Sequence, residues 1–108
     1  MSKVFVVTET GKHNILPAAD FGEIHVVLPP SQSQVYFSSG PTVARMKRAL
    51  AQFSDDDYLL FLGDPTAIAI MSAVAAEANR GRFKALKWDK QETRYIPVQV
   101  DLNGRNEF

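Results

Sequence analysis

Two short segments of the sequence combine hydroxyl, glycine and proline residues in the way that loops between a strand and a helix often do. The candidate ligand-binding residues are Ser38, Ser39, Gly40 and Thr42 in the first segment, and Gly63, Asp64 and Thr66 in the second. The free N–H groups at the start of a helix can hold a phosphate or carboxylate, and nearby hydroxyls can add hydrogen bonds. One hypothesis is therefore a phosphate-bearing small ligand or nucleotide at these loops.

The same two segments also have a purely structural interpretation. Neither matches GxGxxG or GxxxxGK[ST], and the carboxylate of Asp64 would repel an anion from the second helix. Pro41 and Pro65 suit the first position of a helix, and Asp64 suits the capping position before it. We favour the structural interpretation and keep ligand binding as the alternative.

A second group of candidates lies near the C-terminal end, where basic and aromatic residues are interleaved. The candidate partner-binding residues are Lys84, Lys87, Trp88, Lys90, Arg94 and Tyr95. Such a mixture can grip phosphates and stack on bases. Strand alternation, however, puts Lys84 and Trp88 on one face and Lys87 on the other, which weakens a nucleic-acid groove. In the structural alternative, Phe83 and Trp88 belong to the core and the basic side chains are solvated.

Other groups with chemical potential form no recognisable site. Ser39, His25 and Asp64 lack the GxSxG context of a hydrolase nucleophile. His13 and His25 are too few for a zinc site, and the run 55–57 of three aspartates indicates a solvated turn. We expect no catalytic residues, no metal and no cofactor, which favours a protein without enzymatic activity and leaves that question open.

Composition limits the classes that remain. The chain has 108 residues, 45% of them hydrophobic, which is enough for one domain over residues 1–108. Twelve basic and twelve acidic residues cancel, so no overall charge favours nucleic acid or an anionic membrane. The absence of cysteine excludes disulfides and thiolate chemistry. The apolar runs are too short for a membrane span, so we expect a cytoplasmic protein.

Apolar patterning predicts an α/β fold: a mixed sheet of five or six strands, two helices and a C-terminal antiparallel hairpin. Residues 11–22 are expected to form a loop, and Pro97 should place the last strand at an edge of the sheet. The unbroken apolar run 58–62 indicates a central parallel strand. The predicted strands are 3–8, 23–28, 34–37, 58–62, 82–88 and 93–102, and the predicted helices run from 41 to about 54 and from 65 to 78.

The segment 57–65, the turn 87–92 and the pair Val100-Asp101 resemble small uncharacterised proteins of tailed bacteriophages, over roughly the last half of the chain. The resemblance implies an accessory protein that acts in a bacterial cytoplasm. Our leading hypothesis is a noncatalytic binding or regulatory module that contacts a protein partner or itself, as a homo-oligomer, through the terminal hairpin and its edge. The alternatives are the small ligand at the two loops and single-stranded nucleic acid on the hairpin.

Overall fold

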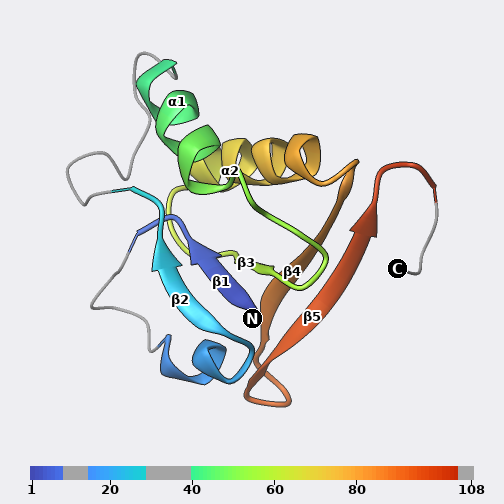
Figure 1. Ribbon diagram of the computed structural model, residues 1–108. Helices are drawn as coiled ribbons and strands as arrows, with labels where there is room; N and C mark the ends of the chain where they lie inside the picture. Colours follow the sequence, from blue (N-terminus) through green and yellow to red (C-terminus); the bar gives the residue numbers. More distant parts are fainter. Residues whose placement is uncertain (9–14, 29–39, 105–108) are drawn as a thin grey trace.

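The computed structural model describes residues 1–8, 15–28 and 40–104 of the chain. The described elements form one five-stranded sheet with the strand order β2-β1-β3-β4-β5 (Figure 1). In chain order they are β1 (Lys3–Val6), the 3-10 helix η1 (Leu16–Asp20), β2 (Glu23–Val26), α1 (Gly40–Ala49), β3 (Tyr58–Leu60), α2 (Pro65–Ala78), β4 (Arg82–Asp89) and β5 (Arg94–Asp101). The predicted α/β class, with a mixed sheet, two helices and a final hairpin, is confirmed; the strand expected at 34–37 lies outside the described residues.

Four strands of the sheet are parallel and the last is antiparallel. β1 pairs with β2 on one side and β3 on the other, β3 pairs with β4, and β5 runs antiparallel to β4. β3 is the central strand, as its apolar sequence predicts, and both Leu59 and Leu60 are buried. The strand ends earlier than expected, because the N–H of Leu62 donates to the carbonyl of Leu60 at 3.0 Å and turns the chain out of the ladder.

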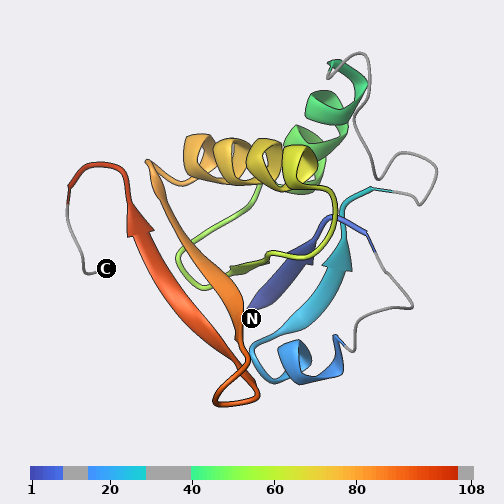
Figure 2. The ribbon, with the colours of Figure 1, turned by 180° about the vertical axis from the view of Figure 1, so that it is seen from behind.

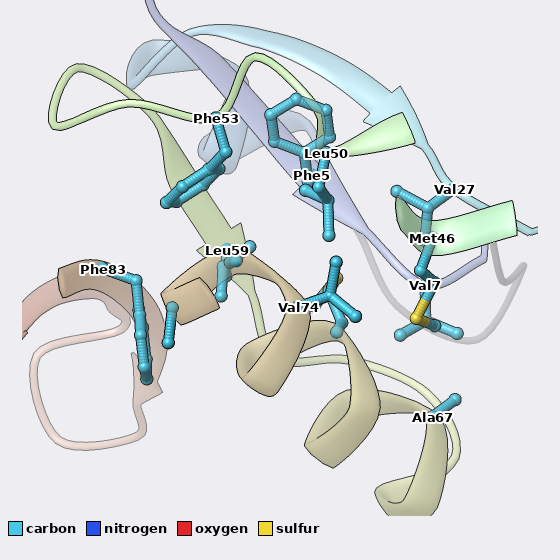
Figure 3. Close-up of a cluster of buried hydrophobic side chains, with 14 of the residues drawn as sticks. Phe5, Val7, Val27, Met46, Leu50, Phe53, Leu59, Ala67, Val74 and Phe83 are labelled. Carbon is cyan, nitrogen blue, oxygen red and sulfur yellow. The ribbon is translucent and has the colours of Figure 1, made fainter. Parts of the chain in front are cut away.

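Both α-helices cover the same face of the sheet (Figures 1 and 2). Figure 3 shows the core between the helices and the sheet, where Met46 of α1 and Leu50, just after it, pack in one cluster with Val7 of the segment after β1 and Val74 of α2. Burial of a side chain of this size contributes about 1.5–3 kcal/mol. The small buried residues of α2, such as Ala67, allow that helix to lie close to its neighbours. Met46, Leu50 and Phe53, which fall at helical spacing in the sequence, are all buried, although α1 ends at Ala49 rather than near residue 54.

The opposite face of the sheet is partly covered by η1. Its buried residue Ala18 packs in a second apolar cluster that includes Val6, Leu60 and Tyr95. The prediction of a plain loop over 11–22 was wrong for the part that forms η1. A helix of five residues is too short to leave a detectable hydrophobic period, which explains the error.

The acidic turn before β3 joins separate parts of the chain. Asp57 is only 4% exposed, and its carboxylate accepts hydrogen bonds from the N–H of Lys3 at 3.0 Å and from the N–H of Ser54 at 2.9 Å. Asp55 pairs with the guanidinium of Arg82 at 2.6 Å. The interpretation of this turn as solvated was therefore wrong for Asp57, because its side chain accepts one main-chain donor from the distant residue Lys3 and another from the nearby residue Ser54.

No helix among the described residues has both the length and the apolar character needed to span a membrane. The C-terminal hairpin packs against the two α-helices on one face of the sheet and against η1 on the other.

We expect Asp57→Ala to lower the free energy of unfolding by about 1–3 kcal/mol, because it leaves buried donors without an acceptor. Asp56→Ala is the matched control, since Asp56 is exposed and its substitution should change stability by about 0.5 kcal/mol or less. Urea unfolding followed by circular dichroism measures both values. Equal stability of the two variants would contradict this role of Asp57.

Candidate functional site

The start of α2 is organised by the residues of the second predicted loop. Asp64 is the N-cap, as predicted, and its Oδ2 accepts the N–H of Ala67 at 3.0 Å. Gly63 has a φ of +119°, which favours glycine, and a Cβ there would lie 3.4 Å from the Cβ of Val7. Thr66 is exposed in the first turn. The Asp64 carboxylate thus already occupies one of the donors that an anion would use.

The first predicted loop lies partly outside the described residues, which include neither Ser38 nor Ser39. Gly40 begins α1 and is exposed, whereas Thr42 is buried. Because β2 and β3 both run parallel to β1, their carboxyl ends lie at the same end of the sheet, but β1 separates the two strands. Ligand binding by the two loops stays a prediction.

One polar group at this carboxyl end of the parallel strands was missed by the sequence analysis. Thr8 follows β1, is buried, and its hydroxyl has no hydrogen-bond partner within the part of the chain that the structure describes. A threonine at the end of an apolar run gives no signal of this kind, because burial of its hydroxyl is decided by the neighbouring segments.

The sequence predicted neither a triad nor a metal site, and the described residues that were considered for them have other contacts. His25 lies on β2 with its Nε2 3.0 Å from a carboxylate oxygen of Glu23, and the Asp64 carboxylate caps α2. Ser39 and His13 fall outside the described ranges. Within residues 1–8, 15–28 and 40–104, no group of three or more histidine or acidic side chains is placed to hold a metal ion.

The C-terminal hairpin follows the predicted alternation of faces. Phe83 and Ala85 of β4 join the core under the helices, whereas Leu86 joins the cluster on the η1 side. Lys84 and Trp88, at even spacing from Leu86, belong to the η1 side. The basic residues of the hairpin are thereby divided between the two faces.

Trp88 and Tyr95 face each other across the hairpin. They are register partners, and their ring centroids lie 5.0 Å apart in an edge-to-face arrangement. Tyr95 is 5% exposed, but Trp88 keeps 40% of its surface exposed. The structural interpretation that places Phe83 and Trp88 in the core is therefore correct for Phe83 and wrong for Trp88, because the tryptophan lies beyond the cover of η1, near the turn.

A hollow of about 300 Å³ brings several predicted partner-binding residues together near this turn. Its apolar part comes from Ile96 and Val98 of β5, and Val98 is 42% exposed. The remaining lining residues are Lys87, Trp88, Asp89 and Lys90. Arg94 is exposed and pairs in register with Asp89 at the start of β5. The roles of Ile96 and Val98 were missed, because an alternating strand does not show which of its faces a helix will leave uncovered.

A wider, open depression of about 560 Å³ lies on the η1 side of the hairpin. It is lined by Tyr58, Lys84, Pro97 and Gln99. The Nζ of Lys84 lies 4.2 Å from the ring centroid of Tyr58, within the range of a cation–π contact. Tyr58 begins the apolar run 58–62 that was predicted to form a central strand, and it is half-buried, so this end of the strand reaches the surface.

The outer side of β5 carries main-chain groups that no described strand pairs with. The carbonyl of Leu86 accepts the N–H of Phe61 at 3.4 Å, so the main-chain groups of Leu86 point toward β3. Those of its register partner, Pro97, point away from β4. At the other end, the N–H of Leu102 donates to the carbonyl of Gly81 at 2.8 Å. By alternation, Tyr95, Pro97 and Gln99 direct their main-chain groups outward. The prediction that Pro97 marks an edge strand is confirmed.

Burial raises the pKa of the Tyr95 phenol above its ordinary value of 10.0. As pH increases, the phenol of Tyr95 therefore loses its proton at a lower pH in the unfolded chain than in the folded one. The contribution of this group to the stability of the fold is complete below pH 10.0 and is lost as pH rises through the folded pKa. We expect Tyr95→Phe to remove part of the alkaline loss of stability. Urea unfolding at neutral and alkaline pH measures this effect, and identical pH profiles for the two proteins would contradict it.

A family model described as "Phage Pam3 gp32-like protein" matches residues 2–102. The bacteriophage resemblance is thus confirmed, but its restriction to the last half of the chain was wrong. No curated protein and no solved structure matches the chain. Because the matched range extends from before β1 to after β5, the whole described sheet, with its C-terminal hairpin, lies within it, and the chain belongs to the phage Pam3 gp32-like protein family.

Proposed function

We propose that this phage protein is a noncatalytic binding module that contacts another protein through the hairpin formed by β4 and β5. The observation that carries the proposal is the hollow of the hairpin, which exposed Val98 and half-buried Ile96 line from the helix side and to which Trp88 of the neighbouring strand also contributes. Exposed apolar side chains in a concave surface are typical of contact sites. The bacterial cytoplasm is the compartment in which we propose that the contact forms.

Two further features of the hairpin support a contact at this end of the molecule. Trp88 is held by its ring contact with buried Tyr95, so little side-chain entropy would be lost when a partner covers it. Tryptophan is also among the residues that most often dominate binding energy. The outward main-chain groups of β5 add hydrogen-bonding capacity along the same edge.

Val98→Asp should weaken capture of the partner by about tenfold or more, because a charge would be placed within an apolar contact. Val26→Asp is a matched control: Val26 is 45% exposed, against 42% for Val98, and lies on β2 at the other edge of the sheet. Tagged variants incubated with proteins of purified virions and of infected cells, followed by mass spectrometry, measure capture. Light scattering after size exclusion measures self-association.

The two variants should have similar stability, since both substituted residues are exposed. Loss of a captured protein, or of a dimer, in Val98→Asp with retention in Val26→Asp supports the hairpin as the contact surface. Equal behaviour of the two variants, or a monomer that captures nothing, rejects it.

A second candidate function is single-stranded nucleic-acid binding in the open depression. Its support is the placement of Lys84 over the Tyr58 ring, which puts a cation and an aromatic face at one surface. Against it, the nearby guanidinium of Arg82 is engaged with Asp55, and Lys87 belongs to the other face.

For this candidate, we expect Lys84→Ala to reduce the slope of log affinity against log salt by about 1. Lys87→Ala on the opposite face should leave the slope unchanged. Fluorescence anisotropy with labelled single-stranded oligonucleotides at several salt concentrations measures both. Binding that is absent, independent of salt, or equally affected by the two substitutions would reject the candidate.

A further inference from the structure

We infer that the partner of the β5 edge is a second copy of this chain, paired antiparallel to β5 about a two-fold axis at Val98. The inference rests on the proposed function, since it names the occupant of the same hairpin surface. It would join two five-stranded sheets into one continuous sheet. The argument depends on main-chain geometry, on the position of Pro97, and on the side chains that the pairing brings together.

Main-chain geometry restricts the registers that two β5 strands can adopt. The main-chain groups of Tyr95, Pro97 and Gln99 point away from the sheet, whereas the main-chain groups of Ile96 and Val98 point toward β4. Hydrogen-bonded pairs between copies must therefore join outward residues to outward residues. The two-fold axis then passes through a residue of β5. Registers in which one β5 strand is displaced by a single residue against the other are excluded.

Pro97 selects among the remaining registers. The longest overlaps of β5 (Arg94–Asp101) with itself place the axis at Pro97 or at Val98. An axis at Pro97 would set two carbonyls opposite each other with no N–H between them, because proline has no donor. An axis at Val98 instead places Gln99 opposite Pro97, and the N–H of Gln99 can donate to the carbonyl of Pro97 in both halves of the pair.

The side chains that meet in this register are compatible. On the face that carries the helices, Val98 lies opposite Val98 and Ile96 lies opposite Val100 of the second copy. This arrangement extends the apolar lining of the hollow with β-branched residues from the second chain. On the η1 face Tyr95 lies opposite Asp101, and no two residues of like charge are directly opposed within β5.

Cysteine trapping tests this register directly, because the natural chain has no cysteine and each variant carries a single thiol. At a two-fold axis, the Val98 Cα atoms would be about 4.5 Å apart, as in a pair without hydrogen bonds, which is compatible with a disulfide. We expect Val98→Cys to form a covalent dimer under mild oxidation about tenfold or more faster than Val26→Cys on the opposite edge. Non-reducing gel electrophoresis over time measures the rates.

Two further experiments fix the register. Gln99→Cys should crosslink poorly, because its counterpart would lie on a diagonal about 7–8 Å away. Ile96→Cys mixed with Val100→Cys should give a crosslinked heterodimer, whereas each variant alone should not. Efficient crosslinking of Gln99→Cys, of Ile96→Cys alone or of Val100→Cys alone would overturn the register.

The result also separates this inference from the function that it depends on. If Val98→Cys and the mixed pair crosslink no faster than Val26→Cys, self-pairing is wrong. If Val98→Asp nevertheless loses a captured phage protein that Val26→Asp retains, the hairpin remains a contact surface for a different partner. If neither effect is seen, both the inference and the proposed function fall.

Discussion

The pairing of β3 with β4, in which the N–H of Phe61 donates to the carbonyl of Leu86, determines which main-chain groups of the C-terminal hairpin face the open edge of the sheet. Because it turns the main-chain groups of Leu86 toward β3, the register partner Pro97 must turn its own groups away from the sheet. By the alternation of side chains along each strand, the side chain of Leu86 lies in the cluster near η1 and that of Val98 lies on the helix side. A contact at the centre of the sheet thus decides what β5 offers at its edge.

The two faces of the hairpin consequently have different characters. On the helix side, the helices cover Phe83 and Ala85 of β4 but not Val98, the register partner of Ala85 on the outer strand β5, so an apolar surface and a lysine remain accessible together. On the η1 side, Lys84 rests on Tyr58 and the surface is open and more polar. The division of basic groups between the faces favours protein contact over a continuous nucleic-acid groove, which needs its cations along one track.

Several features of the chain could be predicted because they depend on neighbours in sequence. The cap formed by Asp64, the apolar stripe through Met46 and Leu50, and the antiparallel pairing of the last two strands all follow from local spacing. Asp57 could not be placed in the same way. Its burial depends on the main chain of Lys3, which lies 54 residues away and approaches it through the pairing of β1 with β3.

The sequence by itself determined the class of fold, the cysteine-free chemistry and the edge position of the proline-containing strand, because each follows from residue type or short-range periodicity. Tertiary structure alone decided the strand order, the burial of Asp57 and the exposure of Trp88 and Val98. The physical reason is that period-two alternation separates the two faces of a strand without stating what covers them. That cover comes from η1 and the α-helices, and it extends only as far as those elements are long.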